Sequence, residues 1–269
     1  MVLLIIIFPM IIIGGIFVYF NQKGKTNNRI LVETGNIVSG ESNEDYINDA
    51  DSNLEKAPFN SEEYKSLSDG EYLTDKGYTL TIEDGVAYVE GNMIVNKTYS
   101  LPEYYKPSNP EKTITGEKCN NCIDKETMSA FKMMQSDASS IGLNIYISSG
   151  YRSYSYQEGL YDRYSAVDGI EGADMYSARA GHSEHQSGLC FDLNTIDDSF
   201  AYTSEGIWVN DNAHLYGFII RYPKGKESIT GYQYESWHLR YVGKELATIL
   251  YNNGNWLTME EYYGLSSNY

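Results

Sequence analysis

The residues best suited to metal chemistry are two of the four histidines in this chain of 269 residues. His185 lies in the segment GHSEHQSGLCFDL, where Asp192 follows on an expected strand. His238 lies in the segment YESWHLRYV, where Glu235 precedes it by three positions. Two imidazoles and one carboxylate are a typical set of ligands for a catalytic zinc ion, because they leave a fourth position open for water. A further carboxylate that is not a ligand can take a proton from that water.

The spacing of these residues leaves other interpretations open. It matches neither a His-Glu-x-x-His helix nor a zinc finger, and a single histidine is more often a core or surface residue than a ligand. We expect His182 to lie in the loop around the site, and His214 to be structural or exposed. Glu184 could be a carboxylate at the edge of the pocket or a solvated one, and we favour the solvated position. Cys190 is expected to replace a small core residue. Arg221 could either shape a cleft or pair with a carboxylate.

Several segments, in this order along the chain, resemble the VanY-type D-alanyl-D-alanine carboxypeptidases. They are SGYRS, GHSEHQSGLCFDL, YGFIIRYP and YESWHLRYVG, and the resemblance extends from about Met93 to Tyr251. Proteins of this family are zinc peptidases that share the fold of the Hedgehog amino-terminal domain. The chain departs from the family pattern at Cys190, where alanine is common, and at Ser236, where proline is frequent. The resemblance implies a zinc enzyme that acts on peptidoglycan stem peptides.

The resemblance also implies the roles of the metal-site residues. It places the zinc ligands on His185, Asp192 and His238, and the general base on Glu235. This agrees with the chemistry of peptide hydrolysis, because zinc can lower the pKa of a water molecule to about 7. A carboxylate three residues before a ligand can take the proton of that water and pass it to the leaving amine.

The same resemblance implies that Arg152 binds the free carboxylate of the substrate. A guanidinium offers a planar fork of donors that matches a carboxylate or a developing oxyanion. A carboxypeptidase needs such a group, because the free carboxylate distinguishes its substrate from a peptide bond inside a chain. The resemblance further implies that Gln157 and Ser187 line the pocket of the terminal residue.

The elements that must position these residues follow from the periodicity of apolar side chains. Helices and antiparallel strands are interleaved without regular βαβ units, which indicates an α+β fold. The resemblance implies an antiparallel sheet with flanking helices, as in the Hedgehog and DD-peptidase folds. We expect strands over 143–149, 188–193, 218–222 and 235–242, and helices over 125–141, from about 154, over 206–217 and over 243–253.

The part of the chain before these elements divides into three segments. Residues 1–20 carry no charge and are long enough to span a bilayer core of about 30 Å as a helix, so we expect an uncleaved transmembrane anchor. Residues 21–70 are rich in acidic and small polar residues, which favours a flexible stalk. Residues 71–118 read as a small β-rich lead-in to a catalytic domain over 119–269.

Charge and cysteine content exclude some classes of protein. The chain has 20 basic and 37 acidic side chains, for a net charge of −17, which argues against a nucleic-acid partner. Three cysteines cannot form a disulfide framework. Cys119 and Cys122 are expected to staple a local loop, because a redox pair should directly follow a strand and a zinc ribbon needs a second pair.

The leading hypothesis is a zinc-dependent D-alanyl-D-alanine carboxypeptidase that is anchored in the cell membrane by one helix and faces outward. Alternatives are an L,D-carboxypeptidase that acts on tetrapeptide stems and a non-catalytic zinc module that binds wall peptides. The presence of both Glu235 and Arg152 argues against a pure binding module, which needs no base. Basic residues at positions 23, 25 and 29 favour a cytoplasmic body, but the expected substrate exists only outside the membrane.

Overall fold

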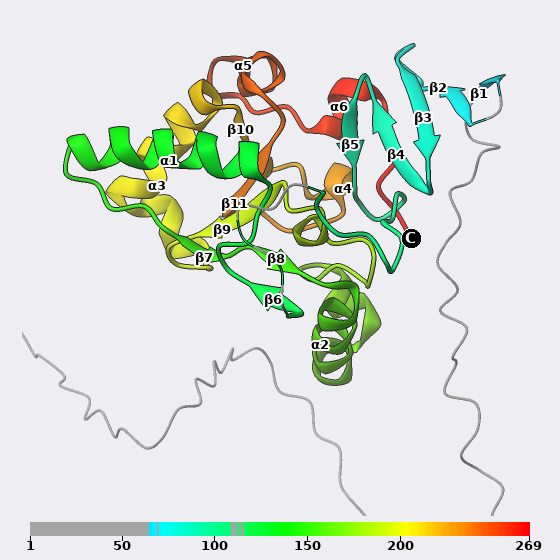
Figure 1. The fold of residues 1–269 in the computed structure, drawn as a ribbon, viewed down its shortest axis with the longest axis horizontal. Coiled ribbons are helices and arrows are strands. Elements are labelled where there is room, and N and C mark those ends of the chain that lie inside the picture. The colour runs from blue at the N-terminus through cyan, green and yellow to red at the C-terminus, as the bar shows by residue number, and fades with distance from the viewer. Residues whose placement is uncertain (1–64, 69, 109–111, 113, 115) are drawn as a thin grey trace, which may run out of the picture. The chain divides into compact units, whose positions relative to one another are not determined.

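The computed structural model of the chain describes residues 65–68, 70–108, 112, 114 and 116–269 (Figure 1). The expected anchor over 1–20 and almost all of the expected stalk lie outside these residues. In the described part of the chain, no helix combines the length and apolar character needed to cross a membrane.

The first described elements form an antiparallel β-meander, and its first strand lies within the segment that the sequence indicated as a stalk. Five antiparallel strands follow one another in chain order, and two-residue turns join the last three. In the first of these turns, Asp84 and Gly85 both have positive φ angles of 50° and 78°, as a type I′ hairpin turn requires. Leu80 and Ile94 from this sheet belong to the main hydrophobic core, so the lead-in packs as part of the catalytic body. The strands are β1 (Lys65–Ser68), β2 (Glu71–Leu73), β3 (Thr79–Glu83), β4 (Val86–Val89) and β5 (Asn92–Ile94).

A second antiparallel sheet carries the candidate site. Its four strands lie in the order β10-β11-β9-β7, so strands from distant parts of the sequence are neighbours (Figure 1). Phe191 and Leu239 face each other across β9 and β11 and belong to the core. Because side chains alternate along a strand, the next residue on each strand points to the opposite face. The strands are β7 (Ile147–Ser149), β9 (Cys190–Leu193), β10 (Phe218–Tyr222) and β11 (Glu235–Tyr241).

A two-stranded sheet and six α-helices complete the described fold. Strand β6 (Lys118–Cys119) pairs with β8 (Tyr151–Arg152), which directly follows β7. The first helix starts where the sequence predicts, because the Asp124 side chain accepts hydrogen bonds from two backbone N–H groups of its first turn. The expected α+β fold is therefore confirmed. The helices are α1 (Lys125–Ser140), α2 (Tyr154–Asp174), α3 (Ser204–Asn212), α4 (Glu227–Thr230), α5 (Lys244–Tyr251) and α6 (Met259–Tyr263).

Candidate active site

Two neighbouring strands bring Asp192 and His238 together. Asp192 of β9 lies directly opposite His238 of β11 in the antiparallel register. The distance from Asp192 Oδ1 to His238 Nδ1 is 3.2 Å. Both side chains are almost fully buried, and both line a cleft of about 760 Å³.

His185 reaches the same point from a short 3-10 turn, Glu184–Gln186, that precedes β9. Its Nδ1 lies 2.6 Å from the carbonyl oxygen of Gly150, so Nδ1 carries the hydrogen and donates it. The lone pair is therefore on Nε2, which lies 3.3 Å from Asp192 Oδ2. An imidazole held in this way is oriented as a metal ligand.

The second imidazole is oriented by a buried carboxylate. His238 Nε2 lies 3.4 Å from Glu184 Oε2, whereas its Nδ1 points toward Asp192 and lies 3.5 Å from Glu235 Oε2. A hydrogen on Nε2, donated to Glu184, leaves the Nδ1 lone pair on the side of the cleft. The rings of His185 and His238 stand almost perpendicular, with their centroids 5.0 Å apart.

This arrangement fits a divalent cation. Nε2 of His185 and Oδ1 of Asp192 are buried and have no hydrogen-bond partner among the described residues. Lone pairs and a carboxylate that converge in a buried site repel one another unless a cation or a proton lies between them. Asp192 contacts both imidazoles, so the structure brings all three predicted ligands together.

Burial raises the pKa of Glu235, the predicted base. Glu235 begins β11, lines the cleft and is 12% exposed at its side chain. Desolvation raises the pKa of Glu235 to about 7, the range in which a carboxylate can both accept and return a proton near neutral pH. Burial also acts on Asp192, but its interactions with His185 and His238 outweigh burial and hold the pKa of Asp192 well below its ordinary value. The two carboxylates are thus suited to different roles.

The expectation that Glu184 is solvated is wrong. Its side chain is fully buried and lies between two arginines, with Oε1 2.8 Å from Arg221 Nε and 2.7 Å from Arg240 Nη1. Burial alone would raise the pKa of Glu184, but the two guanidinium groups outweigh burial and lower it. The turn before β9 directs this side chain into the protein, where a carboxylate is tolerated only with partners. Glu184 thus orients the imidazole of His238 through its Nε2, on the side away from the cleft.

The same network extends to the last described helix. Arg221 pairs with Glu260 of α6 at 2.7 Å, which settles its role as an ion-pair partner. Asn96 donates a hydrogen bond of 2.9 Å to the same carboxylate. The contact between Arg221 and Glu260 could not be predicted from the sequence, because the two residues are far apart in the chain and Glu260 belongs to no recognisable motif.

Arg152 lies at the cleft next to the metal site. Its Nη2 is 3.8 Å from Asp192 Oδ2, and its Nη1 donates a hydrogen bond of 3.1 Å to Gln157 Oε1. Gln157 is itself buried and donates to the backbone oxygen of Ala178 at 2.7 Å. Both residues line the cleft, and Gln157 fixes the direction in which the guanidinium points.

The structure does not place Ser187 with these residues. Its hydroxyl donates to the backbone oxygen of Glu184 and accepts from the backbone N–H of Leu189, and Ser187 is not among the residues that line the cleft. Ser183 does line the cleft, although its sequence context gives no sign of this position. The cleft wall is also rich in large aromatic side chains, namely Tyr156, Tyr164, Tyr176, Tyr222, Tyr232 and Trp237.

The predicted disulfide between Cys119 and Cys122 is confirmed. It closes a loop that packs against the metal site, because a Cβ added at Gly150 would lie only 2.2 Å from the backbone oxygen of Asn120. Glycine at position 150 therefore allows this close approach. Its own carbonyl orients His185, so the loop supports a predicted ligand.

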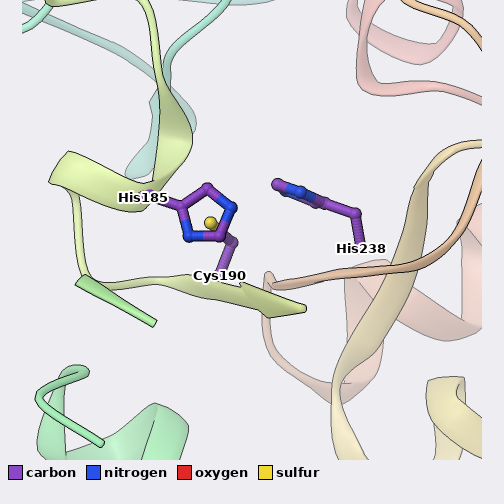
Figure 2. Close-up of side chains that lie close together, drawn as sticks. All are labelled: His185, Cys190 and His238. Atoms are coloured by element: carbon purple, nitrogen blue, oxygen red, sulfur yellow. The ribbon is translucent and has the colours of Figure 1, made fainter. Parts of the chain in front are cut away.

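The remaining histidines bind partners away from the predicted ligand set, whereas the third cysteine lies beside it. His182 is buried with its Nδ1 2.8 Å from the backbone oxygen of Asn96, and His214 stacks on Tyr251 with ring centroids 3.8 Å apart. Cys190 is fully buried, as expected of a core residue. Its sulfur nevertheless faces the two site imidazoles, as Figure 2 shows.

A family model and several known proteins match this chain. The model of the family VanY, D-alanyl-D-alanine carboxypeptidase, matches residues 120–244. YodJ of Bacillus subtilis (strain 168) is 42% identical over 181 residues, which cover 63% of this chain and 66% of YodJ, just under two thirds of its length. A D-alanyl-D-alanine carboxypeptidase of Enterococcus faecium is 31% identical over 233 residues, which cover 81% of this chain and 73% of that protein.

Solved structures similar to this chain include both an LD-carboxypeptidase and a D,D-pentapeptidase. The LD-carboxypeptidase LdcB is 38% identical, with a TM-score of 0.60 over 73% of this chain and 96% of that structure. The vancomycin resistance D,D-pentapeptidase VanY from a VanB-type cassette, solved as a mutant in complex with Zn(II), is 33% identical. Its TM-score is 0.52, over 63% of this chain and 96% of that structure.

Proposed function

Since this chain belongs to the VanY family of D-alanyl-D-alanine carboxypeptidases, we propose that it removes the terminal D-alanine from peptidoglycan stem peptides. The enzyme is a zinc carboxypeptidase. The observation that carries the proposal is the convergence of three buried ligand side chains on one cleft that also holds a buried base and a guanidinium.

The residues that would hold zinc are His185, Asp192 and His238. When bound, zinc polarises the scissile carbonyl and lowers the pKa of a water molecule, so that the water can attack near neutral pH. Glu235 lies 3.5 Å from His238 and accepts the proton that the attacking water loses. The water oxygen bonds to the carbonyl carbon, the C–N bond breaks, and Glu235 returns the proton to the departing amine of D-alanine.

Arg152 selects the end of the peptide. Its guanidinium donates to the free carboxylate of the terminal residue, and Gln157 holds the guanidinium in place by accepting from Nη1. A peptide bond within a chain presents no anion to this group. Because Arg152 lies beside Asp192, a terminal carboxylate bound to Arg152 would bring the last peptide bond to the proposed metal site.

A second candidate function is L,D-carboxypeptidase activity, which removes D-alanine from a tetrapeptide stem. The likeness to LdcB favours it, because the identity of 38% and the TM-score of 0.60 both exceed those for the D,D-pentapeptidase VanY. The two activities use the same metal, base and carboxylate-binding groups. They differ in the residue that precedes the terminal D-alanine.

Defined muropeptides separate these functions. The purified full-length chain in detergent is incubated with pentapeptide and tetrapeptide stems, and the products are identified by mass spectrometry. We expect a pentapeptide to lose one D-alanine and the resulting tetrapeptide to persist. Loss of D-alanine from the tetrapeptide with an intact pentapeptide would establish the L,D-activity. If neither stem is cleaved by protein that contains zinc, the chain is a binding module and the proposal is wrong.

We further propose that the chain is held at the cell membrane by a helix over residues 1–20, with the catalytic body outside. The absence of charge over this segment and the external location of the substrate support this arrangement. The acidic segment 21–70 would then act as a spacer between the membrane and the body.

A further inference from the structure

The third cysteine offers the metal centre a donor that the proposed zinc set does not use. Cys190 is fully buried and has a free thiol. It stands two residues before Asp192 on β9, so both side chains emerge on the same face of the sheet. One ligand atom each from His185, Cys190 and His238 lie within 4.8 Å of one another. The three side chains come from the turn before β9, from β9 and from β11 (Figure 2).

A second observation indicates that this cluster can take a ligand. Nε2 of His185 is buried and has no hydrogen-bond partner in the part of the chain that the structure describes. The described residues contain two clusters of this kind, and they overlap at His238: one adds Asp192 and Glu235, and the other adds His185 and Cys190. The first cluster contributes two oxygen donors, whereas the second contributes one sulfur. In the proposed zinc set Asp192 supplies an oxygen, whereas Cys190 supplies a sulfur, so the centre presents two chemically different sets of donors around the imidazoles of His185 and His238.

We propose that Cys190 forms a second, softer metal site in which its thiolate, with the imidazoles of His185 and His238, binds a thiophilic cation such as Cd²⁺. Soft cations prefer thiolate over carboxylate, whereas zinc accepts both. On binding, the cation exchanges water ligands for one sulfur and two nitrogens, and the thiol releases its proton to solvent. No oxidation or reduction is involved.

The two donor sets exclude each other because both need the same imidazoles. A soft cation bound by Cys190 displaces zinc from the set that contains Asp192, and carboxypeptidase activity is lost while that cation remains. The inference rests on the proposed function only for the identity of the zinc ligands. A protein that cleaves no stem peptide would still bind Cd²⁺ through sulfur, so failure of one proposal is distinguishable from failure of the other.

Sulfur-to-cadmium charge-transfer absorption tests the proposal directly. Metal-free full-length protein is titrated with Cd²⁺, and we expect the ultraviolet charge-transfer band to grow until one equivalent is bound. Cys190→Ala and Cys190→Ser should show no band. Their affinity for Cd²⁺, measured by calorimetry, should fall by at least the 10- to 100-fold that loss of an outer-shell partner commonly causes. Cys119 and Cys122 are joined as a disulfide and offer no thiolate, so the band reports on Cys190.

Three further measurements complete the test. Asp192→Asn should lose zinc but retain the cadmium band, and excess Zn²⁺ should abolish the band in the wild-type protein. Cys190→Ala should still bind about one zinc per chain, which shows that this variant is folded. The proposal is overturned if wild-type protein binds Cd²⁺ without the band, if the band survives in Cys190→Ala, or if zinc and the band coexist on one chain.

Discussion

Arg152 gives the sharpest test of how the substrate is recognised. Its guanidinium lies in the cleft, 3.8 Å from Asp192, and its side chain is 18% exposed. Truncating one partner of a buried charge pair costs roughly 2–5 kcal/mol. Because part of this side chain is exposed and water screens the interaction, the lower half of that range applies. We expect Arg152→Ala to lose about 2–3 kcal/mol of transition-state stabilisation, which is about 30- to 150-fold in kcat/KM.

The assay compares a stem peptide that has a free terminal carboxylate with the same peptide as a terminal amide. The wild-type enzyme should discriminate against the amide by about the same 30- to 150-fold factor. Arg152→Ala should hardly discriminate, because the contact is already missing. Arg152→Lys should resemble the alanine variant, since a lysine keeps the charge but lacks the planar fork.

A matched control uses another cation of the same cleft. Lys118 lines the cleft and lies over the ring of Tyr156, at 5.6 Å from its centroid. Lys118→Ala should keep nearly the full penalty for amidation. Equal penalties in wild type and Arg152→Ala would refute the assignment of Arg152, and loss of the penalty in Lys118→Ala would move the role to that lysine.

Three further outcomes are expected. His238→Ala should lose nearly all zinc by metal analysis, whereas His214→Phe, an imidazole outside the cleft, should retain about one zinc per chain; equal zinc content in the two variants would contradict the ligand assignment. Burial lowers the pKa of His214, so protonation of this imidazole favours the unfolded chain, and the free energy of unfolding should fall as the pH drops below about 6.5. The melting temperature of His214→Phe should fall less over the same pH range. An identical pH dependence in the two proteins would contradict this. Protease added to intact cells should degrade the body and leave a small membrane-bound fragment, whereas full protection would show that the basic residues after position 20 hold the body inside.

The sequence was sufficient to predict the elements that carry the site. Apolar alternation and helical spacing indicated β9, β11 and α1, and the structure has each of them close to its expected place. The pairing of Asp192 with His238 depends on the register of two strands that lie far apart in the sequence. The periodicity of apolar residues along each strand does not predict how two distant strands pair. Only the resemblance to a family therefore indicated that Asp192 and His238 share one site.

Buried polar residues were harder to predict. Glu184 was expected in solvent because an acidic residue is rarely buried, and the sequence does not show that Arg221 and Arg240 converge on it. Ser187 was expected in the pocket, but local geometry directs its hydroxyl to the backbone of its own turn. The positions of such side chains are determined by residues that are close in the folded structure but distant in the sequence.

The central claim is that Glu235 is the base of a zinc carboxypeptidase and not one of its ligands. Replacing it with glutamine keeps the size of the side chain but removes its ability to accept the proton of the attacking water. The decisive measurement is zinc content and D-alanine release on the same preparation of Glu235→Gln. We predict about one zinc per chain and a loss of turnover on the order of 10²-fold or more. Loss of zinc together with activity, or turnover equal to that of the wild type, would contradict the claim.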